Sequence, residues 1–112
     1  MSCHQKNLSE PFWTQVANGY KTVEGRLNSG KSLNLRAGDY VIWSNEKDKI
    51  VKTRITEIVR YSSFEEMIRR EKLSQVLPGV RKISEGVSIY RKIYSEEDEK
   101  QYGVLAIRLA LT

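Results

Sequence analysis

The most informative cluster of residues that could do chemistry lies in one short segment, residues 18–26. Within six residues it holds Lys21, Thr22, Glu24 and Arg26, between a helix-like segment and a loop rich in glycine, asparagine and serine. Lysine and arginine bind phosphates and carboxylates, whereas a glutamate accepts hydrogen bonds from the exocyclic amine of a base or acts as a general base. The segment therefore favours a ligand pocket more than it indicates any particular reaction.

Each residue of this segment also has a structural interpretation. Lys21 could hold a phosphate, serve as a base if burial lowered its pKa, or be a solvated lysine after a turn. Glu24 could contact a ligand, form an internal ion pair with Lys21 or Arg26, or do both, because a buried carboxylate beside two cations stays ionised. Arg26 could bind a phosphate or clamp Glu24. Thr22 is better explained by strand propensity than by a role as nucleophile.

Three aromatic residues are the candidates nearest this site: Tyr20, which is part of the segment, and Trp13 and Trp43, which flank it in the sequence. Aromatic rings stack nucleic-acid bases, at roughly 1–3 kcal/mol per base. Aromatic residues in a small domain also commonly belong to its core. We expect either Trp13, on a predicted helix, or Trp43, at the end of a predicted strand, to line the pocket.

Length and charge indicate one basic domain, residues 1–112. Its net charge of +5 and isoelectric point near 9.4 favour a polyanionic partner such as RNA or a nucleotide, although basic side chains also keep proteins soluble. Seven further cations could form a surface for a phosphate backbone or be scattered, solvated positions: Arg54, Arg60, Arg69, Arg70, Lys72, Arg81 and Lys82.

The sequence predicts no cofactor and no metal. Cys3 is the only cysteine, and together with His4 it supplies two potential ligands without a second pair. There is no glycine-rich phosphate loop. No apolar run approaches the roughly 20 residues of a membrane span, and no signal-peptide pattern is present. We therefore expect a cytoplasmic or nuclear protein in a reducing compartment.

The predicted elements are strands with inserted helices. A helix follows Ser9, which is expected to cap it, and further helices begin at the caps Ser63, Ser84 and Ser95. Strands are predicted at 20–27, 40–43, 50–61 and 104–111, the last in a central position because its apolar run is almost continuous. This order predicts an α+β fold around a curved sheet or small barrel.

Five segments, in order along nearly the whole chain, resemble the ASCH domain of the PUA-like superfamily. They are Asn18 to Leu27, Leu35 to Trp43, Tyr61 to Met67, Leu77-Pro78-Gly79 and Tyr94 to Leu105. The resemblance implies a small β-barrel with helices closing one end, and a cleft beside the first helix and the 18–27 segment. It also implies a connection with RNA binding and RNA modification.

One ASCH branch of similar length hydrolyses the acetyl amide of acetylcytidine, and ribonuclease activity has been proposed for other ASCH proteins. In that branch a lysine corresponds to Lys21 and an arginine to Arg26, but Glu24 stands where its nucleophilic threonine lies. We therefore expect a module that binds RNA, a nucleotide or a modified nucleoside around Lys21, Glu24 and Arg26. The alternatives are a small hydrolase of a modified nucleoside or of RNA, in which Lys21 and Glu24 activate water or substrate, and a regulator that binds a protein.

Overall fold

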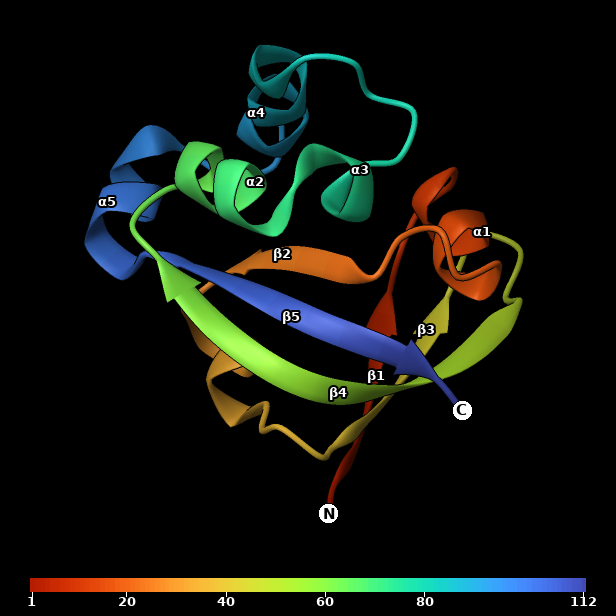
Figure 1. Ribbon diagram of the computed structural model, residues 1–112. Helices are drawn as coiled ribbons and strands as arrows, with labels where there is room; N and C mark the ends of the chain where they lie inside the picture. Colours follow the sequence, from red (N-terminus) through yellow and green to blue (C-terminus); the bar gives the residue numbers. More distant parts are fainter.

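Five strands form one mixed, strongly curved sheet in the computed structural model, which describes residues 1–112 (Figure 1). The order across the sheet is β1-β3-β4-β5-β2, with β1 parallel to β3 and every other neighbouring pair antiparallel. The strands are β1 (Cys3–Asn7), β2 (Val23–Leu27), β3 (Tyr40–Ser44), β4 (Ile50–Tyr61) and β5 (Val104–Leu111). The predicted α+β fold around a barrel-like sheet, with β5 inside it, is confirmed.

Strand β4 explains how the sheet curls. Residues 50–54 pair with β3 and residues 53–61 pair with β5, and the register of the second pairing shifts between Ile55 and Glu57. A bulge of this kind bends a strand and increases its twist. The curl brings the edge strands β1 and β2 to face each other: Nη2 of Arg26 donates a hydrogen bond to the backbone oxygen of Asn7, at 3.0 Å. A side chain thus spans the gap between the two edge strands.

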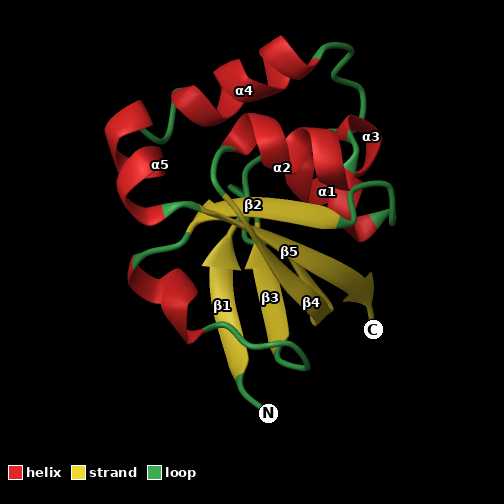
Figure 2. Ribbon diagram, turned by 60° about the vertical axis from the view of Figure 1, so that its left-hand side comes forward, coloured by secondary structure: helices red, strands yellow, loops and turns green.

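Helices gather at one end of the sheet (Figure 2). They are α2 (Phe64–Glu71), α3 (Leu73–Val76), α4 (Ile83–Arg91) and α5 (Glu96–Tyr102), while α1 (Phe12–Ala17) follows β1 and a 3₁₀ turn spans Gly30–Asn34. No helix has the length and apolar character needed to cross a bilayer.

Two of the predicted helix caps are confirmed, and two are wrong. The side chain of Ser63 accepts a hydrogen bond from the Glu66 amide, and that of Ser95 accepts one from the Asp98 amide. Helix α1 instead begins after Pro11, and Ser9 contributes only its backbone oxygen, which accepts from the amides at 12 and 13. Helix α4 begins one residue before Ser84, after Lys82.

Two hydrophobic cores fill the molecule. One lies under the helical end and includes Phe64, Met67 and Tyr90, and the other lies inside the curved sheet and includes Trp43, Ile55 and Ile107. The side chain of one partly buried residue, Phe12 of α1, packs against both.

Candidate ligand site between the edge strands

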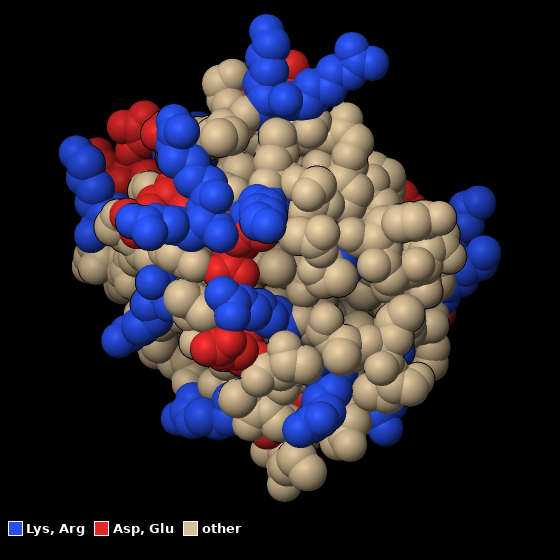
Figure 3. Space-filling view, viewed as in Figure 1, with Lys and Arg blue, Asp and Glu red and all other residues tan.

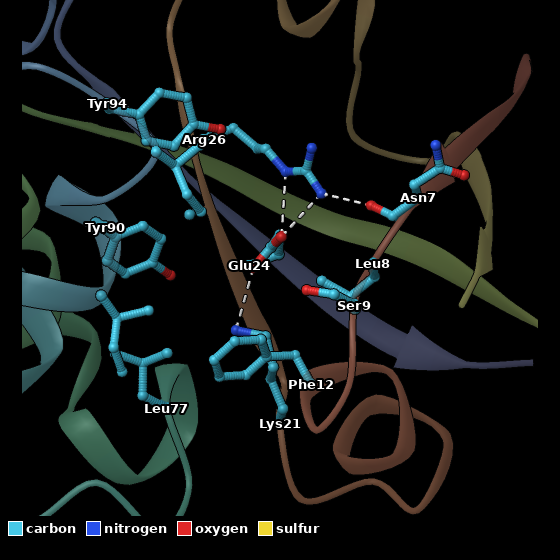
Figure 4. Close-up of a pocket in the computed structure, with 13 residues that line it drawn as sticks. Asn7, Leu8, Ser9, Phe12, Lys21, Glu24, Arg26, Leu77, Tyr90 and Tyr94 are labelled. Atoms are coloured by element: carbon cyan, nitrogen blue, oxygen red, sulfur yellow. Dashed lines mark hydrogen bonds and ion pairs between the residues drawn. The ribbon is translucent and has the colours of Figure 1, made fainter. Parts of the chain in front are cut away.

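A cavity of about 260 Å³ opens where β1, β2, α1 and α4 meet (Figure 4). Asn7, Leu8 and Ser9 form one side of it, and Lys21, Glu24, Gly25 and Arg26 form another. The remaining wall is apolar or aromatic and comes from α1, from α4 and from the residues just after α3 and α4: Phe12, Leu77, Ile89, Tyr90, Ile93 and Tyr94. The structure therefore brings the three charged residues singled out in the sequence to one cavity.

Lys21 lies just before β2, and its side chain turns back toward Glu24. Its Nζ donates to the backbone oxygen of Val23 at 2.7 Å and to that of Val76, and lies 3.2 Å from Oε1 of Glu24. An ammonium has three protons, so these three acceptors use all of them. Strict alternation over a strand from residue 20 would place Lys21 and Glu24 on opposite faces, but β2 begins only at Val23.

Arg26 holds the other oxygen of Glu24. Its Nε and Nη2 lie 3.1 and 3.0 Å from Oε2, and the guanidinium carbon lies 5.4 Å from the centre of the Trp43 ring. Nη1 of Arg26 makes no hydrogen bond within the protein, whereas Nη2 also reaches Asn7. The expected clamp on Glu24 and the expected ion pair with Lys21 are both present.

The charges in this site stabilise one another. Burial alone would raise the pKa of Glu24, but the positive charges of Lys21 and Arg26 outweigh it and hold that pKa below its ordinary value. Burial lowers the pKa of Lys21, and the carboxylate of Glu24 opposes this shift. Burial would lower the pKa of Arg26, and Glu24 reverses the effect so that the net shift is upward. Glu24 is thus an ionised carboxylate between two cations.

Two further lysines add positive charge near the site. Burial lowers the pKa of Lys6 on β1, and the nearby charges of Arg26 and Lys31 lower it further. Neither Lys6 nor Lys31 forms an ion pair. Elsewhere the cations are dispersed: Figure 3 shows several separate groups of Lys and Arg on one face, some beside acidic side chains. Arg69, for example, lies 3.3 Å from Glu65.

The aromatic residues of the cavity differ from those expected. Tyr20 is 67 % exposed and does not line the cavity. Trp13 packs against the barrel core and donates its indole N–H to the backbone oxygen of Trp43. Trp43 is fully buried in that core, where its indole N–H donates to Oγ1 of Thr53. The expectation that Trp13 or Trp43 borders the cavity is therefore not met, because Trp43 is part of the barrel core and Trp13 packs against it.

Tyr90 of α4 and Tyr94, three residues after the end of that helix, supply the aromatic groups that the sequence analysis did not select. Each ring stacks on Phe64, with centroids 4.4 and 5.3 Å away. Burial, followed by the charge of Glu24, raises the pKa of Tyr90 well above its ordinary value, so its hydroxyl stays protonated. The i, i+4 spacing of two tyrosines on a predicted helix was the available signal, although it does not reveal which strand the helix faces.

Comparison with known proteins places this arrangement in a family. A family model described as the ASCH domain matches residues 7–112. The crystal structure of hypothetical protein PH0355 has 40 % sequence identity and a TM-score of 0.90, covering 98 % of this chain and 99 % of that one. The solution structure of protein PF0455 from Pyrococcus furiosus also has 40 % identity, with a TM-score of 0.80 and coverage of 99 % and 97 %.

A more distant structure shares the fold. The crystal structure of a ZmASCH variant from Zymomonas mobilis has 13 % identity and a TM-score of 0.66, covering 95 % of this chain and 66 % of that one. No functionally curated protein matches this sequence.

Proposed function

Because the chain belongs to the ASCH domain family, a PUA-like family generally associated with RNA binding, we propose that its cavity binds a nucleotide of RNA or a modified nucleoside. In this proposal Glu24 and Arg26 contact the ligand, and Lys21 holds Glu24 in place. The aromatic side chains on the opposite wall cover the faces of the base.

The observation that carries this proposal is the unused hydrogen-bonding capacity of Glu24. A carboxylate oxygen accepts about two hydrogen bonds. Oε2 faces two donors of Arg26, whereas Oε1 faces only the ammonium of Lys21. One acceptor position therefore remains on an ionised carboxylate that lines the cavity. The exocyclic amine or ring N–H of a base is a suitable donor for it.

The size and charge of the cavity support a single nucleotide as the ligand. Its volume of about 260 Å³ lies just below the range of roughly 300–1,000 Å³ for typical ligand pockets, which suits one base better than a duplex. Glu24 neutralises only one of the two cations beside it, and Nη1 of Arg26 has no partner in the protein. Lys6 and Lys31 add positive charge that suits a phosphate.

Hydrolysis of acetylcytidine, another modified nucleoside or RNA is the second candidate function. The buried lysine with a lowered pKa beside a carboxylate favours it. Two observations weigh against it. Lys21 already donates all three of its protons, so it is not free to act on a substrate. The lowered pKa of Glu24 makes it a weak general base.

Binding and turnover are distinguished in one experiment. The protein is incubated with cytidine, acetylcytidine, the other common nucleosides and a short single-stranded RNA. Binding is measured by ligand-observed NMR, and products are measured by chromatography. We expect binding without turnover, and an RNA affinity that falls as salt concentration rises. Product formation that Glu24→Gln abolishes would establish the hydrolase instead, and no binding at low salt would overturn both.

A matched pair of variants tests the role of Glu24. Glu24→Gln removes the charge at the cavity, and Glu97→Gln removes one from an exposed position on α5. Hydrogen bonds to charged groups contribute about 1.5–3 kcal/mol, so Glu24→Gln is expected to weaken nucleoside binding at least tenfold, while Glu97→Gln leaves it unchanged. Circular dichroism checks that both variants are folded.

A further inference from the structure

One hydroxyl at the cavity has no acceptor for its proton. Tyr90 is 5 % exposed, and no group of the protein accepts a hydrogen bond from its Oη; the hydrogen-bonding group that acts on this oxygen is the backbone amide of Gly25, which opposes the rise in the pKa of Tyr90 caused by burial. In Figure 4 this oxygen points from α4 toward Glu24, across the cavity that both residues line. Buried polar atoms of native proteins almost always have a partner, because an unpaired one keeps the cost of losing its water. An orphaned hydroxyl at a cavity wall therefore indicates an absent partner.

The surroundings of Tyr90 fix its hydroxyl in this position. The ring stacks on Phe64 with centroids 4.4 Å apart and planes inclined by 9°, and Phe64 itself is fully buried. On the other side, a Cβ on residue 25 would lie 2.9 Å from Oη, so the tyrosine fits only because that residue is Gly25. The ring cannot swing toward another acceptor without leaving this stack.

We infer that Tyr90 is a specificity-determining residue. Its hydroxyl donates a hydrogen bond to an acceptor atom at the buried end of the ligand, and the neighbouring donor atom of the ligand gives its hydrogen bond to Glu24. This inference rests on the proposed function and names the edge of the ligand that the site selects. Glu24 can only accept, and a protonated tyrosine can donate, so together they fit a ligand with adjacent donor and acceptor atoms. The polar edge of a nucleobase has this pattern, and an apolar ligand does not.

The free protein provides a first test. Removing a hydroxyl whose proton has no acceptor leaves no acceptor unpaired, so Tyr90→Phe is expected to melt at about the same temperature as the wild type. Tyr61→Phe is the matched control, because the hydroxyl of Tyr61 donates to Oε2 of Glu71. Loss of that bond is expected to lower the melting temperature. A comparable decrease for Tyr90→Phe would overturn the inference, because it would show that the hydroxyl is already satisfied.

Binding provides the second test, with adenosine, cytidine, guanosine and uridine as the probes. For the nucleoside that the wild type binds most tightly, Tyr90→Phe is expected to raise Kd about tenfold, and Tyr61→Phe to leave it unchanged. Equal affinity of Tyr90→Phe and the wild type would overturn this inference and leave the proposed function standing. If the wild type binds none of the four nucleosides, no acetylcytidine and no short RNA, the proposed function fails and this inference fails with it.

Discussion

The ammonium of Lys21 lies 3.2 Å from Oε1 of Glu24, and the two side chains are only 1 % and 9 % exposed. The same ammonium donates to the backbone oxygen of Val76 in α3. A single buried charge thus connects the helical end of the molecule to β2. Its removal leaves a carboxylate and two backbone oxygens without one of their donors.

We therefore expect Lys21→Met to be strongly destabilising. Removing one partner of a buried ion pair typically costs about 3–5 kcal/mol, and urea denaturation measures the loss of unfolding free energy. Lys31→Met is the matched control, because Lys31 is exposed and forms no ion pair; a change within about 0.5 kcal/mol is expected there. Similar results for the two variants would show that the buried ammonium does not stabilise the fold.

Gly25 is expected to be the least tolerant position of β2. An added Cβ would lie 2.7 Å from Cε of Met67 and 2.9 Å from Oη of Tyr90. The methionine end is flexible, but the stacked tyrosine is not. Gly25→Ala should therefore cost about 1–3 kcal/mol, measured by urea denaturation.

A double-mutant cycle with Tyr90→Phe identifies the source of that cost. The second substitution removes the Oη atom that the new methyl group would meet, so part of the lost stability should return. An equal cost of Gly25→Ala with and without the hydroxyl would assign the clash to Met67 and to the Tyr90 ring carbon Cζ, which would lie 3.1 Å from the added Cβ and remains in phenylalanine.

The carboxylate of Glu71 should make the fold sensitive to acid. Hydrogen bonds from Arg108 and then from Tyr61 hold its pKa below the ordinary value of 4.5, although burial opposes them. In the unfolded chain the pKa returns toward 4.5, so this stabilisation is complete above that pH and is lost as pH falls through the lower folded value. Glu24 and Asp39 shift in the same direction.

Unfolding free energy measured against pH should accordingly change little from neutrality down to about pH 5 and decrease below it. Glu71→Gln should flatten this acid limb as well as lower stability at neutral pH. Glu57→Gln provides the control, because Glu57 contacts the same Arg108 but its side chain is 59 % exposed. An acid limb unchanged by Glu71→Gln would contradict the assignment.

Lys6 and Lys31 should contribute to the salt dependence of RNA binding. For a single-stranded RNA, each lysine that pairs with a phosphate adds about 0.7 to the steepness of the plot of log K against log salt. We expect Lys6→Gln and Lys31→Gln each to reduce the steepness by this amount in a filter-binding titration. Lys52→Gln removes the same charge from a position over the Tyr40 ring, where it is not among the charges that act on Lys6, and should change the slope less. Equal slopes for all three would place the phosphates elsewhere.

Local sequence patterns predicted the helices and strands better than they predicted the contacts between them. The Ser63 and Ser95 caps and the central position of β5 followed from sequence because each depends on neighbouring residues or on a continuous apolar run. The residue at which β2 begins could not be predicted in this way. The amides of Lys21 and Thr22 donate to the backbone oxygens of Gln15 in α1 and Gln75 in α3, although the backbone oxygen of Thr22 still accepts from the amide of Leu109 in β5.

The same distinction applies to the site. Lys21, Glu24 and Arg26 were predictable as a group because they are close in sequence. Tyr90 of α4 and Tyr94, in the segment after that helix, reach the same cavity from more than 60 positions later in the chain, through tertiary packing. Nothing in the local sequence distinguishes tyrosines that line a cavity from tyrosines that fill a core.

The cavity also lies at the boundary between two hydrophobic cores, and Phe12 is the one side chain among those packed around the cores that contacts both. Few apolar contacts across a boundary make local opening inexpensive relative to global unfolding. A ligand in this position contacts residues of both cores at once. Occupancy should therefore slow amide hydrogen exchange in α4 and in β1 together.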